Sequence, residues 1–280
     1  MTTEDAPAAT PAAGSEPKEE PKTFSTEELF VVVVVVLPFC SVQMFPDGVN
    51  SVFLKPKEEA DRLEEVYGKG QGIFENPEGR DIAMNAEKIK ALLAANGLKE
   101  GATIVDLGAG TGLFLSSFAH MVGSEGKLYA SEISEAFAEL LRRKAAQDEL
   151  VKSVTEIIVS PEDSLSIADG VADVVFICDV YHHLTYPVTV MRHVRRILKP
   201  EGKLVMIDFH RDDEKIWRKP KGWAYQHLRA DQDTFRSEIL SAGFTLVEEP
   251  EIDTLTENYI MIFSPNPPDA ETSAPEAKSA

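Results

Sequence analysis

The sequence has few of the features that mark disulfide-stapled, nucleic-acid-binding or membrane proteins. Its 280 residues include two cysteines, Cys40 and Cys178, too few for a disulfide framework, and a reducing compartment is expected. Basic residues are scarce, because 28 Lys and Arg stand against 47 Asp and Glu, for a formal net charge of -19. That charge repels nucleic acid and anionic lipid, so we expect no nucleic-acid or membrane partner.

Long apolar runs are also missing, with one exception. Residues 29–37 read LFVVVVVVL, nine apolar residues that end before Pro38 and are too few to span a bilayer. Valine is β-branched and favours an extended backbone, so we expect a buried strand here; an aggregation-prone or membrane-surface segment is the alternative. The acidic, Pro- and Ala-rich N-terminus lacks the basic start of a secretory signal, so a cytoplasmic protein is expected.

The composition divides the chain into four parts. Residues 1–23 and 265–280 are poor in apolar residues and are expected to be disordered tails. Residues 24–60 form an N-terminal segment that matches no familiar pattern. Three placements stay open for its valine strand: pairing with a sheet edge, burial under a cap, or a contact in a homodimer. Residues 61–264 form the main domain, in which apolar strands alternate with amphipathic helices.

This alternation predicts an α/β fold. Strands are expected at 103–107, 127–131, 155–159, 172–178, 203–209, 245–250 and 259–263, with helices near 85–96, 113–121, 188–198 and 233–242 and another that starts at Ser134 as N-cap. Repeated strand–helix units predict a Rossmann-like, doubly wound, mostly parallel seven-stranded sheet with helices on both faces. The last two strands predict an antiparallel C-terminal edge.

A glycine-rich turn follows the first predicted strand. It reads Asp106-Leu107-Gly108-Ala109-Gly110-Thr111-Gly112, and its Gly-x-Gly-x-Gly spacing differs from the Gly-x-Gly-x-x-Gly of dinucleotide-binding folds. Asp106 would repel a pyrophosphate but suits a cationic group. Glu132 ends the second strand, roughly 20 residues after the turn, where a carboxylate accepts ribose hydroxyls. The pattern favours a nucleoside ligand with a positive charge.

These features, with the region of Asp179 and the stretch 198–204, resemble the class I S-adenosylmethionine (SAM)-dependent methyltransferases from about residue 88 to 263. The resemblance implies SAM as the cofactor. No motif with metal-binding spacing is present, so no resident metal is predicted. The resemblance places Asp106, Gly108 and Gly110 around the methionine part, with Ala109 and Gly112 in the same loop. It also places Glu132 on the ribose, Ile133 on the adenine, Glu162 or Asp163 at the adenine amine, and Asp179 beside the methyl group.

Histidines gather where the strands of such a fold end. His182 and His183 follow the fourth strand, His210 follows the fifth, and His227 lies in the segment before the sixth. An oxygen, nitrogen or thiol acceptor must lose a proton, and histidine is the natural base near neutral pH. The candidate base is His182 or His183, with His210 second. Tyr181 is expected to orient the acceptor or shield the methyl group.

A metal site is the alternative reading of these histidines. His182 or His183 with Asp208, His210 and His227 are residue types that bind divalent ions, but their spacing has no metal-binding signature. The same region holds Trp217, Trp223 and Tyr225, which either line an aromatic acceptor pocket or form the core of a cap over it.

The sequence therefore predicts a SAM-dependent methyltransferase that acts on a small-molecule acceptor. The chain lacks the Asn/Asp-Pro-Pro-Tyr stretch of base and glutamine methyltransferases, and it lacks the several cysteines of arsenic methyltransferases. Two alternatives stay open: a non-catalytic SAM-fold binding or scaffold protein, and a nicotinamide-dependent oxidoreductase. The first would be favoured if His182 and His183 faced away from the methyl position.

Overall fold

The computed structural model describes residues 50–68 and 72–267. The valine-rich stretch, Cys40, the tail 1–23 and residues 268–280 of the predicted tail 265–280 lie outside these residues, so the predictions for them stay untested. The start of that second tail was predicted too early, because Pro265 is the last residue of a strand and pairs with Phe244. None of the described helices is long and apolar enough to cross a membrane.

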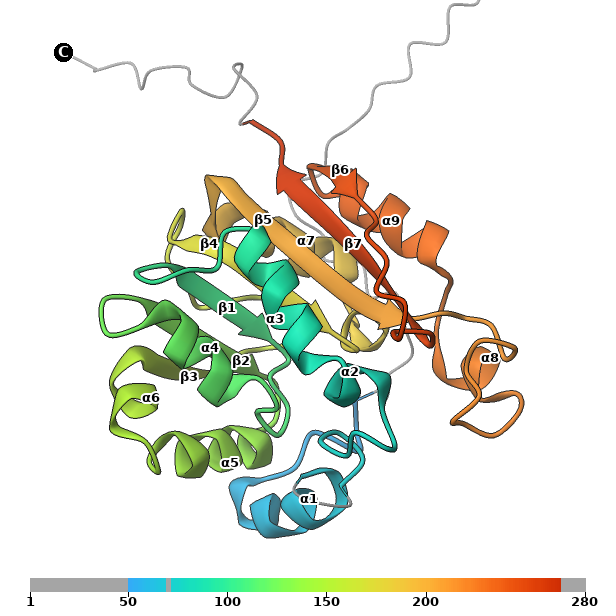
Figure 1. Cartoon of the computed structure of the whole chain (residues 1–280), viewed down its shortest axis with the longest axis horizontal. Coiled ribbons are helices and arrows are strands. Elements are labelled where there is room, and N and C mark those ends of the chain that lie inside the picture. Colours follow the sequence, from blue (N-terminus) through green and yellow to red (C-terminus); the bar gives the residue numbers. More distant parts are fainter. Residues whose placement is uncertain (1–49, 69–71, 268–280) are drawn as a thin grey trace, which may run out of the picture. The chain divides into compact units, whose positions relative to one another are not determined.

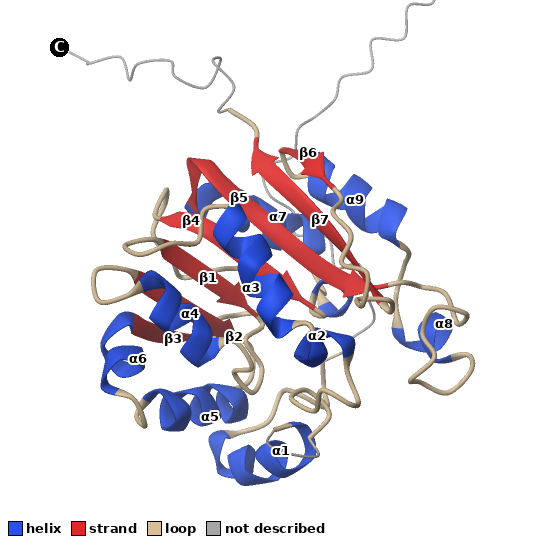
Figure 2. Cartoon of the chain, in the orientation of Figure 1, coloured by secondary structure: helices blue, strands red, loops and turns tan. Residues whose placement is uncertain are grey.

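The strands form one seven-stranded sheet in the order β3-β2-β1-β4-β5-β7-β6 (Figure 1). Its members are β1 (Thr103–Leu107), β2 (Lys127–Glu132), β3 (Thr155–Val159), β4 (Ala172–Cys178), β5 (Leu198–Phe209), β6 (Phe244–Glu248) and β7 (Asn258–Pro265). Strands β1 to β5 are parallel neighbours, and β7 runs antiparallel between β5 and β6 (Figure 2). The predicted fold is confirmed, with β6 as the outermost strand.

The largest difference from the predicted strand boundaries is at the start of β5, and the other boundaries differ by no more than two residues. Strand β5 starts at Leu198 and not at Lys203, because Leu198 pairs with Ala172 before a register shift that leads to the pairing of Val174 with Lys203. The Lys-Pro-Glu-Gly stretch that follows the predicted helix 188–198 is therefore in the first part of β5.

Helices cover both faces of the sheet (Figure 1). On one face lie α3 (Ala86–Ala95), α4 (Leu115–Val122) and α6 (Glu149–Val154), and on the other lie α7 (Pro187–Ile197) and α9 (Gln232–Ser241). Successive side chains of a strand point to opposite faces of the sheet. Phe176 therefore packs in the core under α3, α4 and α6, and Ile177 packs in the core under α7 and α9. Strand β4 is buried from Val174 to Ile177, which explains the apolar sequence that follows its one charged residue, Asp173.

A smaller layer packs beside α5 (Glu135–Ala145). The described part of the N-terminal segment includes η1 (Lys57–Glu59) and leads into α1 (Ala60–Tyr67), whose Ala60 and Leu63 pack against Phe137 and Leu140 of α5. Ser134 is the N-cap of α5, as predicted, and accepts a hydrogen bond from the amide of Phe137. The turns α2 (Asp81–Met84), η2 (Tyr181–His183) and α8 (Trp223–His227) were not predicted.

Phe118 on α4 is expected to be one of the strongest contributors to stability. Its ring is fully buried, stacks on Phe114 with centroids 5.1 Å apart and meets Phe176 edge-on at 5.4 Å. Phe118→Ala should lower the free energy of unfolding by about 3–5 kcal/mol, through lost contacts and the cavity left behind. Urea denaturation would measure this, with the exposed Met84→Ala as a control that should change it by less than about 0.5 kcal/mol.

Candidate cofactor and active site

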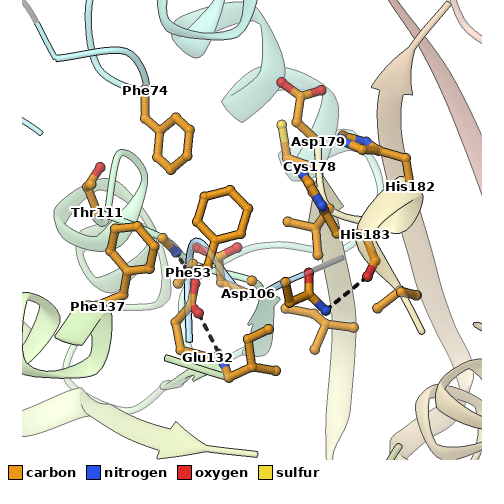
Figure 3. Close-up of a pocket in the computed structure, with 18 of the residues that line it drawn as sticks. Phe53, Phe74, Asp106, Thr111, Glu132, Phe137, Cys178, Asp179, His182 and His183 are labelled. Carbon is orange, nitrogen blue, oxygen red and sulfur yellow. Dashed lines mark hydrogen bonds between the residues drawn. The ribbon is translucent and has the colours of Figure 1, made fainter. Parts of the chain in front are cut away.

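A cavity of about 410 Å³ opens where β1, β2 and β4 end. Strands β1 and β4 are neighbours in the sheet, although β2 and β3 lie between them in sequence, so the strand order reverses at this point. Ligands of open α/β sheets bind at such reversals, beyond the carboxyl ends of the strands. Figure 3 shows Glu132 and Asp106 near three phenylalanines, with Asp179, His182 and His183 on another side of the cavity.

The glycine loop brings its backbone to the wall of this cavity. Gly108, Ala109 and Gly110 line it, and Gly108 has a φ of 81°, where only glycine is relaxed. A Cβ at Gly108 would lie 2.5 Å from a methyl carbon of Val180, so the position has no room for a side chain. Gly112 does not line the cavity; a Cβ there would meet Leu141, so its role in the described structure is packing.

Two buried carboxyl groups face the cavity beside this loop. Glu132 accepts hydrogen bonds from the amides of Gly110, at 2.5 Å, and Ile133, at 3.0 Å. Asp106 is 5% exposed, and no hydrogen bond to its carboxylate is seen among the described residues. Burial raises the pKa of Asp106 to about 7, with Glu132 adding to the rise, and burial raises the pKa of Glu132 to about 7. The pair is suited to a cationic ligand, which would relieve both shifts.

The structure distinguishes the two acids left open after β3. Glu162 lines the cavity and accepts hydrogen bonds from Asn50, at 2.6 Å, and from the hydroxyl of Thr185, at 2.9 Å. Asp163 is not among the residues that line it. Ile133 lines the same part of the wall. The geometry therefore offers Glu162, and not Asp163, to a ligand.

Asp179 is held by a buried arginine. The Nε and Nη2 atoms of Arg80 donate to its Oδ2 at 3.0 and 2.6 Å, and Asn258 donates to Oδ1 at 2.5 Å. Its φ of 52° is the one positive value for a non-glycine residue in the described chain. Burial raises the pKa of Asp179, and Arg80 opposes that shift. Arg80 also lines the cavity and was not predicted; no sequence spacing connects it to Asp179.

His182 and Asp208 form a buried pair at the far wall. Nδ1 of His182 lies 2.6 Å from Oδ1 of Asp208, and the backbone amide of His182 donates to Oδ2 at 3.0 Å. Burial lowers the pKa of His182 to about 4 and raises that of Asp208 to about 6. At neutral pH the imidazole is neutral beside an ionised carboxylate, which fixes its proton on Nδ1 and leaves the Nε2 lone pair free.

Two more histidines complete this cluster. Nε2 of His182 lies 3.2 Å from Nε2 of His227, and the ring of His183 is 5.1 Å from that of His227. All three line the cavity, so His182 and His183 do not face away from it. Trp223 stacks on His227 with ring centroids 4.4 Å apart and also lines the cavity.

Two predicted catalytic residues lie elsewhere. Tyr181 is fully buried and packs against Phe235. The turn that starts at Val180 directs its side chain into the core under α7 and α9. His210 lies outside the cavity, beside Lys215 and against the ring of Tyr259. Neither is placed to touch an acceptor. Trp217 and Tyr225 are 65% and 54% exposed, so Trp223 alone of the three aromatic residues lines the pocket.

The N-terminal segment supplies residues of the cavity wall that no sequence motif indicated. Phe53 packs edge-on against His183 with centroids 5.2 Å apart, and it meets Phe74 and Phe137 at 6.5 and 6.2 Å. Asn50 donates to Glu162 and to the carbonyl of His183. An Asn or a Phe in a short loop carries no motif, so only the folded chain reveals these contacts.

Known proteins resemble this chain in both sequence and fold. A family model described as a methyltransferase domain matches residues 105–206. The ubiquinone/menaquinone biosynthesis C-methyltransferase UbiE of Shewanella sp. (strain W3-18-1) is 26% identical over 180 residues, which cover 56% of this chain and 71% of that protein.

Two solved structures share the fold. A SAM-dependent methyltransferase from Aquifex aeolicus aligns with a TM-score of 0.57 and 22% identity, over 73% of this chain and 97% of that one. The magnesium protoporphyrin IX methyltransferase of Synechocystis PCC 6803, solved with bound S-adenosylhomocysteine (SAH), aligns with a TM-score of 0.56 and 20% identity, over 78% and 98%. The sheet order, the glycine loop, the matched family model and the UbiE relative together support the assignment of this chain as a class I SAM-dependent methyltransferase.

Proposed function

We propose that the enzyme transfers the methyl group of SAM to a small organic acceptor held beside His182, with His182 as the general base. The observation that carries this proposal is one continuous cavity lined at one end by Asp106, Gly108 and Glu132 and at the other by His182 and His183. A donor that fills the glycine-loop end would present its reactive group to an acceptor near the histidines, and positioning of this kind supplies most of the catalysis in methyl transfer.

The residues at the loop end fit SAM. Bound SAM supplies an electrophilic methyl group on a positively charged sulfur. Asp106 is a buried carboxylate with no described partner, which a cation or an ammonium group would stabilise. Gly108 and Gly110 let the backbone approach the ligand, Glu132 and Glu162 offer acceptors to hydroxyl and amine groups, and Phe74 and Phe137 supply apolar contact.

The His182–Asp208 pair is suited to removing a proton from the acceptor. Asp208 accepts the Nδ1 proton of His182, so the lone pair on Nε2 is available. In the structure Nε2 contacts His227, which stands on the short helix α8 and is exposed. An acceptor hydroxyl would take the place of His227, donate its proton to Nε2 of His182 and become the stronger nucleophile.

The acceptor class that best fits this site is a phenol or hydroquinone. Two aromatic side chains that line the cavity, Phe53 and Trp223, contact His183 and His227 and suit a flat ring. Removal of a phenolic proton makes both the oxygen and a ring carbon nucleophilic, so one base serves O- or C-methylation. The relative that acts in ubiquinone and menaquinone biosynthesis is named as a C-methyltransferase, which supports the same class.

A turnover assay tests this proposal. The tag-free enzyme would be incubated with deuterated-methyl SAM and a panel of phenols and hydroquinones, with aliphatic alcohols of similar size as the matched set. SAH release would report turnover, and mass spectrometry of the product would locate the label on oxygen or carbon. We expect turnover with the phenolic set alone. Bound SAM without SAH release from any phenol would contradict the acceptor class.

SAM binding is expected to tighten as the pH rises through about 7. The pKa values of Asp106 and Glu132 rise from ordinary values of 3.8 and 4.5 to about 7 in the folded protein. Protonation of these two carboxyl groups stabilises the folded protein without ligand. That stabilisation is complete at pH values below the ordinary pKa values and is lost as the pH rises through about 7. A cation in the cavity favours the ionised carboxylates, so binding releases protons below pH 7.

Calorimetric titration with SAM between pH 6 and pH 8 would measure this effect. Below pH 7 the Kd should fall by up to about tenfold per pH unit for each proton released. Asp106→Asn should weaken binding and flatten the pH dependence. Asp163→Asn, a carboxyl outside the cavity, should keep it. A Kd independent of pH in the unchanged protein would argue against a cation beside these carboxyls.

A further inference from the structure

Three imidazoles from two separate elements converge at one wall of the cavity. One nitrogen from each of His182, His183 and His227 lies within 4.8 Å of the others. The Nε2 atoms of His182 and His227 are 3.2 Å apart. Two imidazole nitrogens bound to one tetrahedral Zn²⁺, each at about 2.0–2.1 Å, lie roughly 3.3–3.4 Å apart. We propose that these three histidines bind a divalent transition-metal ion of the zinc type.

The surroundings of His182 match those of a metal-binding histidine. The ring nitrogen that does not face the cluster, Nδ1, is bonded to the fully buried carboxylate of Asp208. Histidines that bind metals commonly donate their second N–H to a carboxylate, which fixes the ring and keeps the lone pair on the ligating nitrogen. Asp208 does this for His182 and is further held by the backbone amides of His182 and Phe209.

A buried nitrogen of the second histidine supports the same site. Nδ1 of His183 is buried and has no hydrogen-bond partner among the described residues. A buried polar atom without a partner is costly, and coordination would satisfy it. Three histidine ligands leave a fourth position open toward the cavity, as in zinc sites that accept a small ligand or water. The spacing in sequence hides the site, because His227 follows His182 by 45 residues.

Metal binding has a direct consequence for the reaction. Nε2 of His182 has one lone pair, so it either accepts the proton of the acceptor or binds the ion. The metal-bound and base-competent states therefore exclude each other, and Zn²⁺ is expected to inhibit methyl transfer reversibly. This consequence rests on the proposed function, whereas the binding itself does not.

Cobalt substitution tests binding without any assay of activity. Tag-free protein, dialysed against a chelator and then against buffer, would be titrated with Co²⁺ while the visible absorption of tetrahedral cobalt is recorded. We expect one ion per chain in the unchanged protein. Asp208→Asn removes the carboxylate that orients His182 and should lower the affinity for Co²⁺ by roughly 10–100-fold. His227→Ala and His183→Ala remove a ligand of the ion and should each lower that affinity by more. His210→Ala, a histidine outside the cluster, should bind as the unchanged protein does.

The outcomes separate the two proposals. Absence of the tetrahedral spectrum, or equal affinity in His227→Ala, His183→Ala and His210→Ala, would overturn the metal site and leave the methyl-transfer proposal intact. Loss of turnover on adding Zn²⁺, with SAM affinity unchanged and with restoration by chelator, would support both. Higher turnover with the ion bound would keep the site but overturn the role of His182 as base.

Discussion

Replacing His182 by alanine is expected to lower kcat by roughly 10²–10⁴-fold, the usual contribution of a positioned general base. The loss should appear in kcat more than in the Kd for SAM, because His182 lies at the acceptor end of the cavity and Asp106 and Glu132 at the other. Asp208→Asn should act in the same direction. An amide beside Nδ1 no longer fixes the proton there, and the Nε2 lone pair is then lost for part of the molecules.

Single-turnover kinetics and SAM titration together would check this result. His182→Gln keeps most of the buried volume and guards against loss of folding, which a melting curve would report. His210→Ala is the matched histidine control and should leave kcat unchanged, since His210 lies outside the cavity. Full activity in His182→Ala with loss in His183→Ala would transfer the role of base to His183, which lines the same wall.

Most of the fold could be predicted because its signals are local. Strand β4 is apolar from Val174 to Cys178 since helices cover both of its faces. Ser134 marks the start of α5 because a short polar side chain satisfies a free amide there. The start of β5 could not be predicted in the same way. Its first residues, Leu198 onward, pair across a register shift, and that pairing depends on the position of β4.

The cofactor end of the site was predictable for a related reason. Asp106, Gly108 and Glu132 stand at the ends of strands or in the turn that follows, and parallel strands bring those ends to one edge. Residues beyond a strand end are harder to place. Asp179 adopts a φ of 52° and a 3-10 turn follows, so Tyr181 enters the core while His182 and His183 face the cavity.

Contacts between distant segments had no sequence signal at all. Arg80 and Asp179 are 99 residues apart, and Asn50 and Glu162 are 112 residues apart. Each pair contributes to the wall of the cavity. An arginine or asparagine in a loop is ordinary in composition, and its partner is set only when the folded chain brings the two segments together.

Gly108→Val is expected to lower the affinity for SAM by roughly 30-fold to 10⁴-fold. A side chain at φ 81° costs about 1–3 kcal/mol, and a Cβ 2.5 Å from a Val180 methyl carbon adds about 1–3 kcal/mol of overpacking. The loop relieves this energy by moving, which carries the amide of Gly110 away from Glu132 and the backbone away from the ligand. At 1.4 kcal/mol per factor of ten, the sum gives that range.

Gly170→Val separates the two causes of this loss. Gly170 has a φ of 63° but open space around its Cβ position, so it has the same backbone strain without the clash and lies away from the cavity. Both variants should melt at lower temperature, and only Gly108→Val should lose SAM binding in calorimetric titration. Adding Val180→Ala to Gly108→Val should recover part of the affinity, since it removes the methyl carbons that the new side chain meets. Equal affinities in the two single variants would mean that close approach of the loop backbone does not hold the cofactor.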